Sequence, residues 1–331
     1  MQLFQKFGPG IGIDLGTANT LIYVKNKGIV YNEPSILAKN TLTKKTIAVG
    51  HDAKAMQGRT HAGIETIRPI RDGVVADFQA TTEMIQHFIK ALTQKSLVGR
   101  KPFIVVSTPT HLTSVERRAV IDATMQAGAK EAIIIEETFA AAIGAGLPVW
   151  EPTGSMIVDI GGGTTEVAIL SLGGVVVSNS IKIAGDEMDR LITKHVKNNH
   201  QLVIGEATAE HIKINLFKEE ENGILDVRGR DIVTGLPRTV KVTASEIALV
   251  LEEAIEQISL VIKQTLEQTP PELASDIIER GLILSGGVAL LPQLERIISE
   301  ITQLPVIIAE TPLESVAKGT AKIVDAPNII K

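Results

Sequence analysis

The chain has 331 residues, of which 44% are apolar, 21% are charged and 3% are aromatic, and its net charge is −5. This composition excludes a basic nucleic-acid-binding protein, and the absence of cysteine excludes a disulfide framework and thiolate chemistry. A single core seldom serves a chain of this length, and no apolar run approaches the length of a membrane span. We therefore expect a two-lobed globular protein with an aliphatic core and no signal peptide.

Strands and helices alternate along the chain, which predicts an α/β fold with helices packed on mostly parallel or mixed sheets. In the first half, strands are expected at 10–16, 20–24, 103–107 and 132–135, and helices around 84–92, after a Ser114 cap and over 139–146. A hinge is expected at 151–154, which read E-P-T-G. In the second half, strands are expected within 155–170 and at 174–183 and 282–285, and helices over 186–199, over 245–267 and from Leu291.

Two stretches of the chain repeat one pattern. Residues 13–20 read I-D-L-G-T-A-N-T, and residues 158–165 read V-D-I-G-G-G-T-T. Each stretch has an apolar strand, an aspartate, a turn that contains glycine, a threonine and the start of a second strand. An internal repeat of this kind predicts two lobes that present the same hairpin to each other across a cleft.

The two hairpins contain the residue types of a phosphate site. Glycine lets a ligand approach the backbone closely, and successive N–H groups in a turn form a concave anion site. Thr17 and Thr164 add hydroxyl donors, whereas Asp14 and Asp159 would repel a bare phosphate. The aspartates therefore imply a cation, and hydrated Mg²⁺ fits because it takes few protein oxygens. The alternative is a pair of ordinary hairpins with aspartate in the turn, and the match between the two copies favours the phosphate site.

A third glycine motif, I-L-S-G-G-V at residues 283–288, follows a predicted strand and precedes a predicted helix. Small residues there would let a purine and a ribose lie on the backbone. Taken alone, the motif is equally that of a plain strand-to-helix turn. The chain has no Walker A pattern and no G-x-G-x-x-G at a strand–helix junction.

Together these motifs resemble the MreB family of bacterial actins, within the superfamily of actin, sugar-kinase and heat-shock-chaperone ATPases. The resemblance covers essentially the whole chain. Besides the hairpins, it is carried by R-D-G-V-V-A-D-F from Arg71, A-A-A-I-G-A-G-L-P from Ala140 and P-P-E-L-A-S-D-I from Pro270.

The resemblance implies an actin-like ATPase fold, in which two lobes, each with a mixed central sheet flanked by helices, form four subdomains around a nucleotide cleft. Lobe I would comprise residues 1–146 and 312–331, with a small subdomain inserted at about 32–75. Lobe II would comprise residues 147–311, with a small subdomain inserted at about 185–240.

The resemblance also implies a site for ATP or ADP with magnesium. Asp14 and Asp159 would hold Mg²⁺ largely through water. Glu137 would orient or activate the attacking water, and Thr164 would help to hold that water or the γ-phosphate. The implied nucleotide-binding residues are Gly16, Thr17, Ala18, Asn19, Gly161, Gly162, Gly163, Thr164, Gly185, Glu187, Lys213, Asn215, Ser285, Gly286, Gly287 and Val288.

Two residues near this implied site, Glu137 and Lys54, also have a structural interpretation. Glu137 also suits a helix N-terminus, where a carboxylate complements the dipole, and both roles can hold together. Lys54 stands where relatives carry a lysine, and we interpret it as an ordinary surface lysine.

Four residues depart from the family pattern. Thr138 replaces a proline after the glutamate pair, Val288 replaces the third glycine of the adenosine motif, Asn215 replaces a glutamate and Phe217 replaces a glycine. Three of these lie on the nucleoside side, while both phosphate hairpins are intact. We therefore expect Mg-ATP binding to survive, with an altered affinity, base selectivity or hydrolysis rate.

By resemblance, ATP would drive head-to-tail polymerisation into paired, membrane-associated filaments that guide cell-wall synthesis and determine cell shape. The implied partners are other copies of the chain, the inner face of the cell membrane, cell-wall elongation proteins and paralogues, with no nucleic acid, in the cytoplasm. Leu3, Phe4 and Phe7 fall on one face of a helix over 1–7, and Leu97 and Val98 occupy a turn, so both segments are candidate lipid contacts. The alternative for 1–7 is a frayed terminus whose apolar residues pack on the body.

Other functions stay open. The substitutions at Thr138, Asn215 and Val288 also suit a filament-forming modulator of a paralogue, with little ATPase activity. A small-molecule kinase of the same superfamily would need a base aimed at a substrate hydroxyl and substrate-binding insertions, and a chaperone would need a peptide-binding domain; the sequence indicates none of these.

Overall fold

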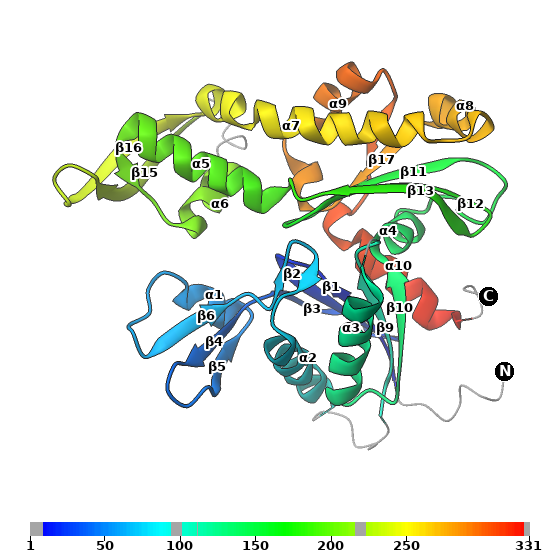
Figure 1. Ribbon diagram of the computed structural model, residues 1–331, viewed down its shortest axis with the longest axis horizontal. Helices are drawn as coiled ribbons and strands as arrows, with labels where there is room; N and C mark the ends of the chain where they lie inside the picture. The colour runs from blue at the N-terminus through cyan, green and yellow to red at the C-terminus, as the bar shows by residue number, and fades with distance from the viewer. Residues whose placement is uncertain (1–8, 94–100, 111, 216–222, 328–331) are drawn as a thin grey trace.

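The structure, a computed structural model, describes residues 9–93, 101–110, 112–215 and 223–327. Figure 1 shows two lobes one above the other, each built around a five-stranded sheet. The expected α/β class with mixed sheets is confirmed. The predicted boundaries of the lobes stay a prediction.

The sheet of the lower lobe has the strand order β10-β9-β1-β2-β3. Strand β1 pairs antiparallel with β2 and parallel with β9, so one hairpin and one crossover meet at β1. Its strands are β1 (Gly10–Leu15), β2 (Asn19–Val24), β3 (Gly28–Pro34), β9 (Phe103–Thr108) and β10 (Glu131–Glu136).

The sheet of the upper lobe repeats this topology with the order β13-β12-β11-β17-β18. Strand β11 pairs antiparallel with β12 and parallel with β17, as β1 does with β2 and β9. Its strands are β11 (Ser155–Ile160), β12 (Thr165–Ser171), β13 (Gly174–Ile181), β17 (Leu282–Ser285) and β18 (Val306–Ile308). The predicted internal repeat is thus confirmed at the level of topology.

Each lobe also carries a small three-stranded sheet, and both small sheets lie at the left of Figure 1. The lower one has β4 (Leu37–Asn40), β5 (Thr46–Val49) and β6 (Ile64–Ile67), with α1 (His51–Met56) packed on it and the pair β7 (Ile70–Arg71) and β8 (Val74–Val75) following. The upper one has β14 (Leu202–Val203), β15 (Ile224–Asp231) and β16 (Pro237–Thr243).

Helices cover the sheets because their apolar residues recur on one face. In the lower lobe these are α2 (Phe78–Thr93) and α3 (Ser114–Gln126). In the upper lobe they are α5 (Gly185–His200), α6 (Glu206–Asn215), the long α7 (Ala244–Glu267), α8 (Pro271–Arg280) and α9 (Leu294–Thr302). Within the described residues, no helix is both long and apolar enough to cross a membrane.

Several helix starts differ from the prediction, and two of them have a clear local cause. The cap of α3 is Thr113, not Ser114: its hydroxyl accepts from the Glu116 N–H, while the Glu116 carboxylate accepts from the Thr113 N–H, and this capping box fixes the start. The helix expected from Leu291 begins at Leu294 and is preceded by a 3₁₀ turn, η2 (Gly287–Leu290), since Pro292 has no N–H with which to continue a helix from η2.

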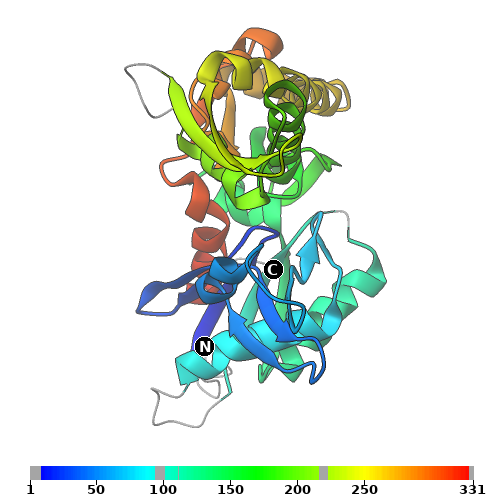
Figure 2. The same cartoon turned by 90° about the vertical axis from the view of Figure 1, so that its left-hand side faces the viewer.

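The lobes meet through α4 (Glu137–Gly144) and α10 (Ser315–Asp325), which lie between the two large sheets (Figures 1 and 2). Helix α10 follows the 3₁₀ turn η3 (Pro312–Glu314) and packs against α4 and β1. The two helices touch backbone to backbone. A Cβ at Gly144 would lie 1.8 Å from the carbonyl oxygen of Ser315, and a Cβ at Gly319 would lie 1.8 Å from that of Ala140.

Candidate functional site

The turns of the two equivalent hairpins meet across the space between the lobes. A Cβ at Gly162 would lie 2.6 Å from the Cβ of Ala18, and one at Gly163 would lie 2.9 Å from Oγ1 of Thr17. Only glycine allows this approach, because any side chain on the second turn would collide with the first. The β1–β2 and β11–β12 hairpins therefore form two walls of one site.

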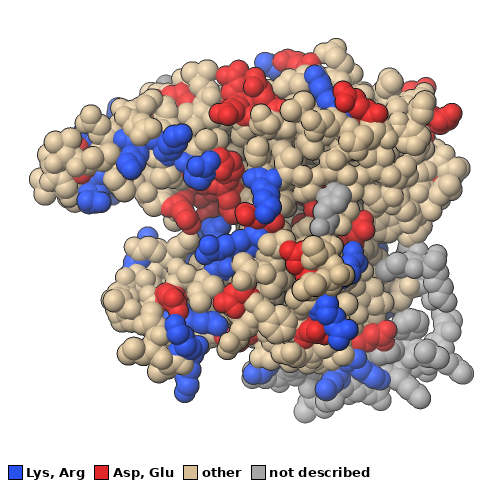
Figure 3. Space-filling view, viewed as in Figure 1, with Lys and Arg blue, Asp and Glu red and all other residues tan. Residues whose placement is uncertain are grey.

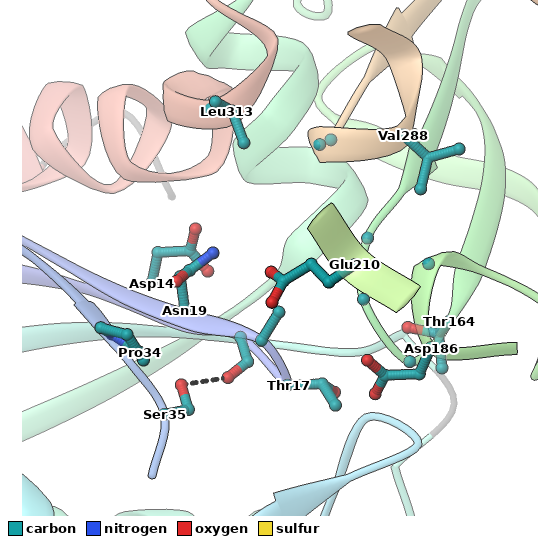
Figure 4. Close-up of a pocket in the computed structure, with 18 of the residues that line it drawn as sticks. Asp14, Thr17, Asn19, Pro34, Ser35, Thr164, Asp186, Glu210, Val288 and Leu313 are labelled. Atoms are coloured by element: carbon teal, nitrogen blue, oxygen red, sulfur yellow. Dashed lines mark hydrogen bonds between the residues drawn. The ribbon is translucent and has the colours of Figure 1, made fainter. Parts of the chain in front are cut away.

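Each turn is held by hydrogen bonds from outside the hairpin. The Ser35 hydroxyl donates to the carbonyl of Gly16 at 2.6 Å, drawn as a dashed line in Figure 4, and the Ser35 N–H donates to the carbonyl of Ala18. In the second turn, the carbonyls of Gly161 and Gly162 accept from the first N–H groups of α5. These bonds fix the two turns before any ligand arrives.

Between the turns lies a cavity of about 360 Å³, within the usual range of small-molecule sites. Figure 4 shows Asp14, Asn19 and Thr17 from the lower lobe, and Thr164, Glu210 and Val288 from the upper lobe, around this cavity. The predicted site residues that line it are Asp14, Gly16, Thr17, Ala18, Asn19, Glu137, Asp159, Gly161, Gly162, Gly163, Thr164, Gly185, Lys213, Gly286, Gly287 and Val288.

Three predicted nucleotide contacts lie outside the lining. Glu187 forms an ion pair with Arg190, and the Asn215 amide bonds to the ring and the carbonyl of His211. Ser285 is fully buried and donates to the carbonyl of Pro312. The candidate lipid contacts Leu3, Phe4, Phe7, Leu97 and Val98, and the departure at Phe217, lie outside the described residues.

Val288 packs against the start of α5 from η2. Its side chain is 5% exposed, and a Cβ at Gly185 would lie 3.5 Å from its Cγ2. The preceding Gly286 has φ of +84°, and a Cβ there would lie 2.3 Å from the carbonyl of Ile160. Gly286 must therefore be glycine, because a side chain there would collide with the second hairpin. Val288 instead fills the space between η2 and α5.

Carboxylates gather at the floor of the cavity by virtue of the strand register. Asp14 stands beside Ser107 of β9, and Asp159 stands beside Ser285 of β17 and opposite Glu166 of β12. Glu137 joins them from the first turn of α4. Among the described residues, no lysine, arginine or histidine forms an ion pair with Asp14, Glu137, Asp159 or Glu166.

The pKa of every carboxylate in this cluster is raised, and burial is the main cause. Burial raises the pKa of Asp14 and that of Glu166 to about 7. Hydrogen bonds from Ser107 to Asp14 and from Thr110 to Glu166 lower these pKa values and so offset part of the rise. Burial, and then the neighbouring carboxylates, raise the pKa of Asp159 and Glu137 well above their usual values. Oδ2 of Asp159 is buried with no hydrogen-bond partner. An all-oxygen donor set with surplus negative charge and an unpartnered oxygen fits Mg²⁺.

The raised pKa values set a pH dependence. Between the ordinary aspartate value of 3.8 and about 7, folded Asp14 binds a proton that the unfolded chain has released. The ligand-free protein therefore loses stability as the pH rises from about 4 to 7, since stability falls wherever the folded state binds more protons.

Replacing Asp159 by asparagine should stabilise the ligand-free protein. The buried charge disappears, and we expect the free energy of unfolding to rise by about 1–3 kcal/mol at pH 8 and by much less at pH 5. Urea melts of both proteins at the two pH values measure this. Asp226→Asn, an exposed carboxylate on β15, is the control and should change little. A variant that is less stable than wild type at pH 8 would contradict the argument.

A hydroxyl chain supports the carboxylates beside Glu137. Thr138 is buried, and its hydroxyl lies 3.1 Å from that of Thr110. Thr110 in turn donates its hydroxyl to Glu166 at 3.0 Å and its N–H to the same carboxylate at 3.1 Å. Through Thr110, Thr138 therefore connects α4, the helix that begins at Glu137, to Glu166.

The mouth of the cavity is bridged by polar contacts between the two small subdomains. We call these the cleft clasp: Lys54 Nζ lies 2.7 Å from Glu210, Gln57 donates to Glu206 at 2.8 Å, and Arg68 lies 3.1 Å from Asp186. Figure 3 shows acidic side chains of the upper lobe facing basic side chains of the lower lobe there. The interpretation of Lys54 as an ordinary surface lysine is thus wrong, since its partner lies across the cleft.

Comparison with known proteins places the chain in a family. A family profile described as MreB/Mbl protein matches residues 8–331. The chain belongs to the MreB/Mbl family. The cell shape-determining protein Mbl of Bacillus subtilis (strain 168) is 48% identical over 322 residues, 96% of each chain. The cell shape-determining protein MreB of Escherichia coli (strain K12) is 50% identical over 326 residues, 96% of this chain and 94% of the relative.

Solved structures agree with this membership of the MreB/Mbl family. MreB 5 of Spiroplasma citri bound to AMPPNP superposes with a TM-score of 0.90 at 39% identity and 97% coverage of both chains. The MamK double helical filament superposes with a TM-score of 0.80 at 18% identity, covering 96% of this chain and 98% of that one, a likeness of fold alone. The predicted actin-like fold is confirmed, and family and fold together support a cytoskeletal role.

Proposed function

We propose that the protein binds Mg-ATP between its two hairpins, hydrolyses it slowly and polymerises head to tail into membrane-associated filaments that guide cell-wall synthesis. The observation that carries the proposal is the pair of equivalent glycine turns facing each other over a cluster of unpaired carboxylates. The Spiroplasma citri relative, solved with AMPPNP and with ADP, supports a nucleotide as the ligand.

The turns would bind the phosphates through backbone N–H groups and the hydroxyls of Thr17 and Thr164, at the place where side chains are absent. Asp14 and Asp159 would hold Mg²⁺, which supplies charge neutralisation for phosphoryl transfer when bound. The residues of η2 and Lys213 would face the nucleoside. Lys213 is held in place by the Gly185 carbonyl at 2.8 Å and by Asp189 at 2.9 Å.

Glu137 would position the attacking water. Burial and the neighbouring carboxylates raise its pKa above the ordinary glutamate value, which is the direction expected of a carboxylate that takes up a proton. Thr164 lies across the cavity on the second turn and would contact the same water or the γ-phosphate. Phosphoryl transfer needs positioning more than a strong base, so a single oriented carboxylate suffices for slow turnover.

A modulator with little ATPase activity is the second candidate. Two features on the nucleoside side of the cavity favour it. The Asn215 amide hydrogen-bonds to His211, and the branched side chain of Val288 lines the cavity. Phosphate release distinguishes the two candidates, because a modulator would polymerise without turnover.

The test is phosphate release and sedimentation in one assay, with and without Mg-ATP and phospholipid vesicles. Wild type should release phosphate and pellet only with Mg-ATP, and should float with the vesicles. Gly163→Val places a side chain against Thr17 and should weaken ATP binding at least about tenfold, because the phosphate wall is blocked. Gly174→Ala, which meets open space, is the matched control. Wild type that neither binds ATP nor pellets would refute the proposal.

A further inference from the structure

Two histidines and a glutamate converge in the upper small subdomain, away from the cavity. His195 and His200 lie on the last turns of α5, and Glu246 lies in the first turn of α7. Helix α5 has 16 residues and so spans about 24 Å, with its other end lining the cavity. The ligand atoms of the three side chains all lie within 4.8 Å of one another.

The geometry is that of a transition-metal site. Nε2 of His200 lies 2.9 Å and Nε2 of His195 lies 3.8 Å from the same carboxylate oxygen, Oε1 of Glu246. Ligands at 2.0–2.2 Å around a tetrahedral Zn²⁺ stand about 3.3–3.6 Å apart, and the observed separations bracket that range. Side-chain exposures of 16%, 21% and 26% leave a path by which water can complete the coordination.

Hydrogen bonding leaves one nitrogen of the cluster without a partner. Nε2 of His195 is buried and has none. The other ring nitrogen, Nδ1, lies 3.3 Å from the amide of Asn199. The oxygen and nitrogen of an amide are assigned from the network rather than observed, so the Asn199 oxygen can accept Nδ1–H. That arrangement presents the lone pair of Nε2 to a metal, as in metal sites whose histidine is oriented by an outer partner.

Charges around the cluster are compatible with a cation. His200 ends α5, where the helix dipole is negative. Arg238 is a cationic neighbour, since it donates to the carbonyl of His200, but its charge is paired with Asp231 at 2.9 Å. Thr243 caps the N-terminus of α7, so the carboxylate of Glu246 is not needed as a helix cap and can bind a cation.

We propose that His195, His200 and Glu246 form a binding site for a divalent transition metal such as Zn²⁺, which ties the end of α5 to the start of α7. Two imidazoles and one carboxylate are a ligand set that Zn²⁺ accepts with water as the fourth ligand. The site is independent of the nucleotide proposal, because none of its ligands lines the cavity.

The test is titration of the nucleotide-free full chain with Zn²⁺ by calorimetry, and with Co²⁺ by visible absorption. Wild type should bind one equivalent with low-micromolar or tighter affinity, gain several degrees in melting temperature, and show the intense absorption of tetrahedral Co²⁺. His195→Gln and His200→Gln should each weaken binding at least about tenfold, because each removes a ligand. His211→Gln, a histidine bonded to Asn215 on α6, is the matched control and should bind as wild type does.

Folding of each variant is checked by circular dichroism without metal. If His200→Gln does not fold, His195→Gln decides, since Nε2 of His195 has no hydrogen bond to lose. Equal Zn²⁺ affinity in wild type and His195→Gln, or octahedral Co²⁺ absorption in wild type, would overturn the proposal and leave a hydrogen-bonded triad only.

Discussion

Gly319→Ala is expected to lower the free energy of unfolding by about 3 kcal/mol or more, and to give insoluble protein at 37 °C if wild type is marginally stable. The new Cβ would lie 1.8 Å from the carbonyl oxygen of Ala140, a backbone atom that cannot move away without shifting α4. Alanine gains about 1 kcal/mol of helix propensity over glycine, but the collision is the larger effect.

Urea melts of Gly319→Ala beside Gly205→Ala measure this difference. Gly205 meets nothing within 4 Å, so its variant should differ little from wild type. Gly144→Ala approaches the same contact from the other helix, at 1.8 Å from the carbonyl of Ser315, and should behave as Gly319→Ala does. A Gly319→Ala protein as stable as wild type would show that α4 and α10 do not touch as described.

Glu137→Gln is expected to lower the rate of phosphate release by roughly 10²- to 10³-fold while ATP binding stays within a few-fold of wild type. The amide keeps the shape of the side chain but cannot accept a proton from water. It also removes one negative charge from the carboxylate cluster, which slightly favours a phosphate nearby. Glu136→Gln, the preceding residue outside the cavity lining, is the matched control and should retain turnover.

Single-turnover phosphate release with excess protein measures this, together with sedimentation. Glu137→Gln should still pellet with Mg-ATP, and its filaments should persist after wild-type filaments have disassembled. Equal turnover in Glu137→Gln and wild type would show that another group positions the attacking water. Loss of ATP binding would instead make Glu137 a structural carboxylate at the start of α4.

The sequence predicted those parts of the fold and site that depend on neighbouring residues. Both hairpins could be found because aspartate, glycine and threonine occur within eight residues, and the repeat then gave the second sheet. Glu166 was missed as a member of the acid cluster, although a glutamate inside the otherwise apolar strand T-E-V-A-I-L-S is a signal that could have found it.

Apart from the facing of the two hairpins, contacts between individual distant residues could not be predicted. Lys54 and Glu210 are 156 residues apart, and nothing near either one indicates the other. The same holds for Gly144 and Gly319, whose close approach depends on how two helices cross. Asn215 shows the limit of resemblance: the sequence aligns this position with a nucleotide contact, whereas its side chain turns to His211 on its own helix.

The cleft clasp implies that the rate at which a molecule leaves the cavity depends on contacts other than those that bind it. A molecule that leaves the cavity through this mouth must first part the tips of the two small subdomains, which breaks the contacts of Lys54, Gln57 and Arg68. Partly exposed ion pairs weaken as salt screens them. The residence time of a molecule in the cleft should therefore shorten with ionic strength, even though the carboxylates of Asp14 and Asp159 that line the cavity are buried, where screening is slight.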